Sequence, residues 1–171
     1  MTRGEEFERL QFRATREKNN SLVESLFHLD STYESNLVPT ELKGRGEENI
    51  MWETLEEELD TGTQKIIYED KDHVHVHKYY KLKNAEAFYS VIQKVTYKDR
   101  KVFHQQEEYE GLDYDPSEGQ SWTWEDVRWY WEMITATEVT FEERQAFADQ
   151  KGIPTLKNSS TGQDWNWEDY E

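Results

Sequence analysis

Residues 73–82 read HVHVHKYYKL and residues 88–97 read FYSVIQKVTY, and these two stretches decide the fold. Apolar and polar side chains alternate along both of them, which is typical of β-strands with one buried and one exposed face. The predicted buried face carries Val74, Val76, Tyr80, Leu82, Tyr89, Val91, Val95 and Tyr97. The predicted exposed face carries His73, His75, His77, Tyr79, Ser90, Lys94 and Thr96.

Two neighbouring stretches extend this pattern into a sheet. Gln64–Asp70 and Val102–Tyr109 are also rich in β-branched and aromatic residues, and short polar turns at 71–72 and 98–100 join two pairs of strands. The sequence therefore predicts an antiparallel meander of about four to six strands within residues 49–110. Ile50–Leu59 fits a strand or a helix, and we favour a strand.

The segments on either side of the sheet have helical periodicity. Two amphipathic helices interrupted near Asn19 precede the meander, and capping-box spacings at Thr123 and Thr140 begin two helices after it. Residues 31–48 contain Pro39 and two glycines among polar residues, which indicates a connection. We predict an α+β fold with one domain over 1–156 and a flexible acidic tail over 157–171.

Composition limits the kinds of function that this chain can have. Its 171 residues include 37 acidic and 20 basic side chains, a net charge of −17, and no cysteine. Disulfides, thiolate catalysis and cysteine-ligated metals are thereby excluded, and no phosphate-binding loop or nucleophile motif occurs. The first thirty residues lack the apolar run of a signal peptide, so we expect a cytoplasmic protein that does not contact membranes.

The acidic residues lead to the primary functional hypothesis. Acids cluster among aromatic residues on both sides of a mildly basic stretch over residues 64–101. Such a surface serves solubility, or it docks onto a basic partner. We predict the second role: a non-enzymatic inhibitor or decoy that occupies a basic surface of a partner protein, for example a nucleic-acid-binding protein. We expect no cofactor and no direct binding of nucleic acid. In composition the chain resembles small acidic phage inhibitors that imitate DNA. The expected contact residues are Glu56, Glu57, Glu58, Asp60, Glu107, Glu108, Glu110, Trp165 and Trp167.

A first alternative is a small-molecule-binding protein. A curved antiparallel sheet with flanking helices can enclose a ligand, and the basic middle stretch suits an anion. The candidate ligand-binding residues are Lys78, Tyr79, Tyr80, Tyr89 and Lys94.

A second alternative is a metal-dependent enzyme. His73, His75 and His77 occupy alternate positions of one predicted strand, so their imidazoles project from the same face. With His104 from a neighbouring strand they could bind zinc or iron, although no established metal-binding motif is complete. A polar outer face of a half-exposed sheet explains the same alternation.

Overall fold

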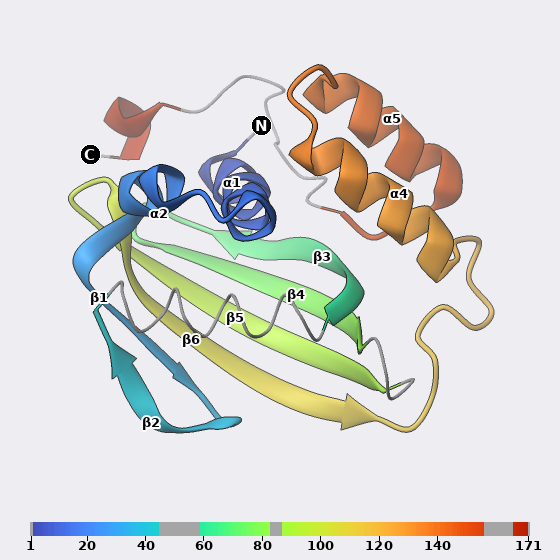
Figure 1. The fold of residues 1–171 in the computed structure, drawn as a ribbon, viewed down its shortest axis with the longest axis horizontal. Coiled ribbons are helices and arrows are strands. Elements are labelled where there is room, and N and C mark those ends of the chain that lie inside the picture. Colours follow the sequence, from blue (N-terminus) through green and yellow to red (C-terminus); the bar gives the residue numbers. More distant parts are fainter. Residues whose placement is uncertain (1, 45–58, 83–86, 156–165, 171) are drawn as a thin grey trace.

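The computed structural model describes residues 2–44, 59–82, 87–155 and 166–170. Two helices, α1 (Arg3–Glu17) and α2 (Asn20–Leu26), precede a six-stranded sheet (Figure 1). The strands are β1 (Phe27–Ser35), β2 (Val38–Lys43), β3 (Leu59–Glu69), β4 (His73–Leu82), β5 (Phe88–Lys98) and β6 (Lys101–Leu112). Helices α4 (Trp124–Thr135) and α5 (Phe141–Lys151) follow, and the 3₁₀ helix η1 (Trp167–Tyr170) lies near the C-terminus. The α+β prediction is confirmed.

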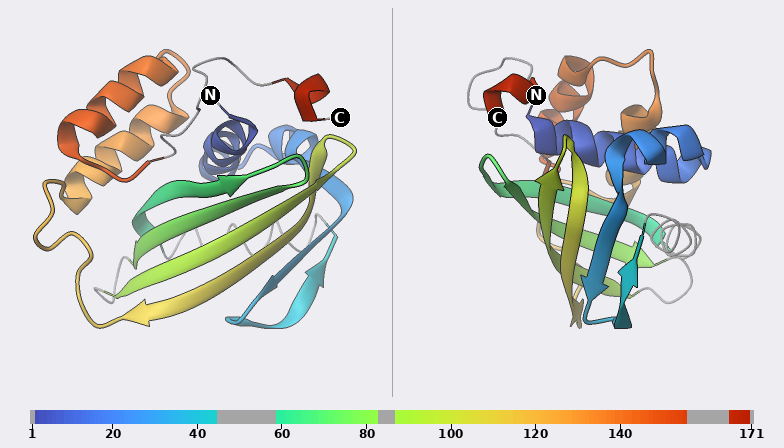
Figure 2. Two further views of the ribbon diagram at one scale, coloured as in Figure 1. Left: turned by 180° about the vertical axis from the view of Figure 1, so that it is seen from behind. Right: turned by 90° about the vertical axis from the view of Figure 1, so that its left-hand side faces the viewer.

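The sheet has the strand order β2-β1-β6-β5-β4-β3. Strands β3 to β6 form the predicted antiparallel meander, whereas β1 runs parallel to β6 and pairs with β2 in a hairpin. Figure 2 shows that the strand direction turns progressively across the sheet, as the normal twist of β-strands requires. The prediction of a connection over residues 31–48 is wrong, because β1 continues to Ser35 and β2 occupies 38–43.

The reason for this error lies in β1 itself. Its buried positions include Phe27, Ser31 and Tyr33, so only two of the three are apolar. The alternation that identifies the meander strands is therefore weak here, and pairing with β6 decides the conformation. Within the ambiguous stretch Ile50–Leu59, residues 50–58 lie outside the described residues, and β3 begins at Leu59.

The two faces of the sheet are as different as the alternation predicts. The inner face, against which α1 packs, carries the fully buried Val74, Val76, Val91 and Val95. The outer face carries the partly exposed histidines of β4 and the exposed Ile92. Lys78 lies on the inner face because its position has the parity of Val74 and Val76, and it is buried with them.

Apolar residues gather at both ends of the inner face. The α4 cluster joins Tyr80, Val91 and Tyr109 of the sheet to α4 and α5, and the α1 cluster joins Val74, Val76, Val95 and Val102 to Phe7 and Phe27. Helix α4 begins with the predicted capping box, in which the Thr123 hydroxyl accepts from the Asp126 backbone N–H and the Asp126 carboxylate accepts from the Thr123 backbone N–H. None of the helices in the described part of the chain is long and apolar enough to cross a membrane.

Residues 167–170 pack against the domain. Trp167 makes an edge contact with Tyr97, and the Tyr170 hydroxyl lies 3.3 Å from a carboxylate oxygen of Glu69. The division into a domain over 1–156 and a flexible tail over 157–171 stays a prediction, but this part of the expected tail contacts the domain.

Candidate functional site

A band of buried polar side chains separates the two apolar clusters on the inner face. We call Glu8, Lys78, Gln93, Gln105 and Glu107 the polar band. Along each of three adjacent strands, its members lie between a residue of the α1 cluster and a residue of the α4 cluster. In β4, for example, Lys78 lies between Val76 and Tyr80. Polar groups in the middle of a core are costly unless they are paired, so the polar band requires an explanation.

Strand register brings the polar band together. Gln93 of β5 lies opposite Glu107 of β6, and Gln105 is paired with Val95 on one side and Tyr33 on the other. Adjacent strands are about 4.8 Å apart, so these side chains are immediate neighbours. Helix α1 adds Glu8 from above the sheet.

Lys78 and Glu8 form a buried ion pair. The Lys78 Nζ lies 3.0 Å from a Glu8 carboxylate oxygen, and the two side chains are only 2% and 1% exposed. Burial is the largest single effect and lowers the pKa of Lys78, but the interactions with Glu8, Tyr80 and Glu107 together outweigh it, so the pKa lies above its usual value. Lys78 is therefore held as a cation, which makes it a fixed positive charge and not a proton donor or nucleophile at neutral pH.

Glu107 differs from Lys78 in that its surroundings favour the neutral form over the charged form. Its side chain is 2% exposed and accepts a hydrogen bond from the Gln93 amide over 3.0 Å. Burial raises the pKa of Glu107 above its ordinary value of 4.5, and the charge of Lys78 opposes that rise only in part. A carboxyl group whose pKa is moved towards neutrality can exchange a proton with a bound molecule.

Several polar atoms of the band have no hydrogen-bond partner among the described residues. They are one carboxylate oxygen each of Glu8 and Glu107, the amide oxygen of Gln93, and both amide atoms of Gln105. Each such atom costs about 1–3 kcal/mol when it is buried unsatisfied. Proteins retain such costs mainly where function needs the groups, so the polar band is the best candidate site.

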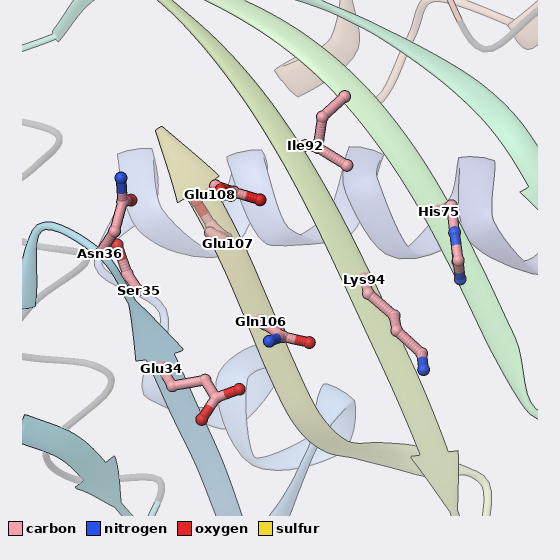
Figure 3. Close-up of a pocket in the computed structure, with 9 residues that line it drawn as sticks. All are labelled: Glu34, Ser35, Asn36, His75, Ile92, Lys94, Gln106, Glu107 and Glu108. Atoms are coloured by element: carbon pink, nitrogen blue, oxygen red, sulfur yellow. The ribbon is translucent and has the colours of Figure 1, made fainter. Parts of the chain in front are cut away.

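An open pocket of about 430 Å³ lies on the outer face (Figure 3). Four lining residues are neighbours across adjacent strands, in the order His75, Lys94, Gln106 and Glu34. The basic groups therefore lie at one end of this row and the acid at the other. Burial, and next the charge of Lys94, lower the pKa of His75 below its usual 6.5. These side chains reach solvent, and a polar outer face of the sheet accounts for them.

The structure divides the predicted ligand-binding residues between the two faces. Lys78 and Tyr80 lie on the inner face, where the Tyr89 ring also contacts the Tyr109 ring, whereas Tyr79 and Lys94 lie on the outer face. Strand parity could have separated them, because alternate residues face opposite sides. Gln93, Gln105 and Glu8 were missed, since a single Gln or Glu carries no motif.

The predicted metal ligands do not come together. His77 contacts the Ser90 hydroxyl at 2.9 Å, His104 contacts the Thr32 hydroxyl at 2.6 Å, and His73 lies 3.5 Å from the Asp70 carboxylate. Within the described residues there is no group of three or more His, Asp or Glu side chains that could hold a metal ion. Zinc or iron binding at these histidines stays an untested prediction.

The predicted acidic and tryptophan contact residues are divided between the core, the outer face of the sheet and the C-terminal segment. Glu107 is buried, while Glu108 and Glu110 are exposed on the outer face of β6. Trp167 packs on its own domain through Tyr97. Glu56, Glu57, Glu58 and Trp165 lie outside the described residues, and of Asp60 only the backbone, in β3, is described.

Comparison with known proteins identifies the fold and not the family. No protein-family model and no curated protein matches the sequence. Among solved structures, a protein from Kribbella flavida DSM 17836 is 8% identical with a TM-score of 0.51, covering 62% of this chain and 85% of that one. A hypothetical protein with a ketosteroid isomerase-like fold from Catenulispora acidiphila DSM 44928 is 17% identical, with a TM-score of 0.49 and coverage of 68% and 89%. An M. tuberculosis LEH-like epoxide hydrolase is 12% identical, with a TM-score of 0.48 and coverage of 62% and 81%.

These findings correct the primary functional hypothesis. The prediction of a non-enzymatic acidic inhibitor or DNA mimic is wrong, because the solved structures that this chain resembles include a protein with a ketosteroid isomerase-like fold and an epoxide hydrolase. The burial of Glu107 and the packing of Trp167 agree with this correction, since neither side chain is free to dock onto a partner. The small-molecule alternative fits the findings better.

Proposed function

We propose that the chain binds a small, neutral molecule at the polar band and exchanges a proton with it through Glu107. The observation that carries this proposal is the set of buried, unsatisfied polar atoms between the two apolar clusters. A ligand carbonyl would accept from the Gln105 side-chain N–H, a ligand hydroxyl could in addition donate to one of the unsatisfied oxygens, and the apolar part of the ligand would contact the flanking clusters. The expected cytoplasmic location belongs to this proposal as a prediction.

Charge favours a neutral ligand over the anion expected from the basic middle stretch. Lys78 already pairs with Glu8, and Glu107 adds a further acid nearby. An anion would therefore meet one compensated cation and a carboxyl group, so its charge would gain little there. A ketone or an alcohol avoids that cost.

Access to the polar band requires movement of α1. The side chains of the band are at most 2% exposed, and the pair between Glu8 and Lys78 joins α1 to β4. A ligand therefore reaches Gln93 and Gln105 only when α1 separates from this part of the sheet. The unsatisfied atoms lower the cost of that opening, because the closed state does not satisfy them either.

The chemistry we propose is proton abstraction beside a carbonyl group. The Glu107 carboxylate takes a proton from the adjacent carbon, the carbonyl becomes an enolate, and the Gln105 side-chain N–H, which has no partner among the described residues, donates to the negative oxygen. Return of the proton to carbon regenerates the carboxylate, so atoms and charge balance.

Side-chain amide NMR tests binding directly. The probes are cyclohexanone, cyclohexanol and methylcyclohexane, the last of which has no hydrogen-bonding group. We expect the first two to shift the Gln93 and Gln105 side-chain amide signals saturably, and the third to leave them in place. Gln105→Leu should abolish the saturable shift at Gln93, whereas the matched control Gln106→Leu, an exposed neighbour, should retain it.

Deuterium exchange of cyclohexanone in D₂O tests the proton step. The protein should accelerate loss of the α-hydrogen signal, Glu107→Gln should abolish this acceleration, and Glu108→Gln should preserve it. In the NMR experiment, equal shifts of the Gln93 signal in Gln105→Leu and Gln106→Leu, or no shift with any probe, would refute ligand binding at the polar band. Binding without exchange would refute the catalytic part alone.

A further inference from the structure

We propose a second binding site, for a planar aromatic carboxylate, in a pocket between α1, α2, β5 and η1. The pocket has a volume of about 190 Å³. Its apolar lining consists of Phe7, Leu10, Leu26, Tyr97 and Trp167. It is distinct from the polar band, because no member of the band lines it.

The shape of the pocket suits a flat ring. The Tyr97 ring meets Trp167 at a centroid distance of 5.9 Å and Phe7 at 6.2 Å, both in edge-on geometry. Aromatic walls of this kind favour an aromatic guest. An engineered apolar cavity of about 150 Å³ admits benzene, so this pocket accommodates one ring or a fused pair.

The Tyr97 wall is held rigidly in place by Arg3. The Arg3 guanidinium carbon lies 3.9 Å from the centre of the Tyr97 ring and 4.1 Å from that of Tyr170. Its nitrogens donate to the backbone carbonyls of Asp70 and Lys71 over 2.8 and 2.9 Å. Arg3 is almost fully buried, so the pocket has a fixed, preorganised side.

Charge at the pocket favours an anion. Arg100 lines the pocket, its side chain is 47% exposed, and its guanidinium lies 3.3 Å from the Glu168 carboxylate. The acid in the lining, Glu6, is bound through both carboxylate oxygens by Arg9, at 2.7 and 2.9 Å. A ligand carboxylate can therefore compete with Glu168 for Arg100, and the displaced Glu168 side chain, which is 69% exposed, is then solvated by water.

The backbone at Arg100 supplies a separate indication of function. Asp99 and Arg100 have φ values of +52° and +64°, in the left-handed region that favours glycine. Tight hairpin turns of this kind usually carry Asn-Gly. Arg100 adopts this backbone conformation at an energetic cost, and its side chain lines the pocket. Residues held in such conformations cluster at functional sites, which indicates that the Arg100 side chain has a function.

Calorimetric titration of the full chain tests the site with indole-3-acetate and its neutral isostere indole-3-acetamide. We expect both to bind, the acetate more tightly. Arg100→Gly should weaken acetate binding about three- to tenfold without changing acetamide binding, while keeping or raising the thermal midpoint because glycine relieves the strained φ. Glu168→Gln should tighten acetate binding about two- to fivefold by removing the competing carboxylate.

Two tryptophan variants locate the site. Trp167→Ala should abolish binding of both probes, and Trp167→Phe should retain it. Trp129→Ala removes an indole that is 61% exposed on α4 and should have no effect. Failure of both probes to bind, an equal response of the two probes to Arg100→Gly, or an equal loss in Trp129→Ala would each overturn the proposal.

Discussion

The pKa of Glu107 has a measurable consequence for stability. Burial raises this pKa in the folded state above the ordinary value of 4.5. The folded protein therefore holds the proton over a pH range in which the unfolded chain has released it, and stability falls as the pH rises through that range. Removing the ionisable group at position 107 should remove this part of the pH dependence.

We predict that Glu107→Gln makes the protein more stable at pH 7 and flattens the decline in stability above pH 4.5. Urea unfolding between pH 4.5 and pH 7.5 measures both effects. Glu108→Gln, which alters an exposed neighbour, should reproduce the wild-type profile. A Glu107→Gln profile parallel to that of the wild type would show that Glu107 does not titrate differently on folding.

At the scale of single elements, the close approach of β3 to β4 depends on a glycine. Gly62 lies in β3, opposite Tyr80, and a Cβ atom built there would lie 2.5 Å from a Tyr80 ring carbon and 2.8 Å from the Tyr79 carbonyl oxygen. The carbonyl belongs to the backbone and cannot move aside easily. Gly62 thus lets the Tyr80 ring pack across β3 beside the polar band.

Gly62→Ala should therefore destabilise the protein by about 1–3 kcal/mol, as overpacked cores do. Gly111 in β6 provides a matched control, since a Cβ there would approach nothing closer than 3.8 Å, at the Tyr89 ring. Chemical denaturation should show a much smaller effect for Gly111→Ala. Equal losses in the two variants would indicate a general effect of glycine replacement in strands and not the contact with Tyr80.

At the scale of the whole molecule, the net charge of −17 opposes folding. Like charges are closer together in the compact state than in the unfolded chain, so their mutual repulsion lowers stability. Salt reduces this repulsion, because the screening length falls from about 30 Å at 0.01 M to about 8 Å at 0.15 M ionic strength.

The thermal midpoint should consequently rise when sodium chloride is increased from 0.01 to 0.15 M. The double variant Glu110→Gln/Glu118→Gln removes two exposed acids and should show a smaller rise. Differential scanning calorimetry measures both midpoints. A midpoint that falls with salt would mean that ion pairs such as that of Arg9 with Glu6 outweigh the overall repulsion.

The sequence by itself determined the parts of this protein that depend on local pattern. Alternation along 73–82 and 88–97 predicts the meander and the burial of each face, and the Thr123 capping box predicts the start of α4. These signals are readable because period and capping involve residues only a few positions apart.

Only the tertiary structure decided which strands pair with β1 and which polar residues meet. Tyr33 and Gln105 are 72 positions apart in sequence, and Glu8 and Lys78 are 70 positions apart, yet each pair is adjacent in the fold. No local pattern encodes such contacts. The polar band exists because strand register and the docking of α1 place isolated Gln, Glu and Lys side chains side by side, and the low polarity of the surrounding core then sets their pKa values.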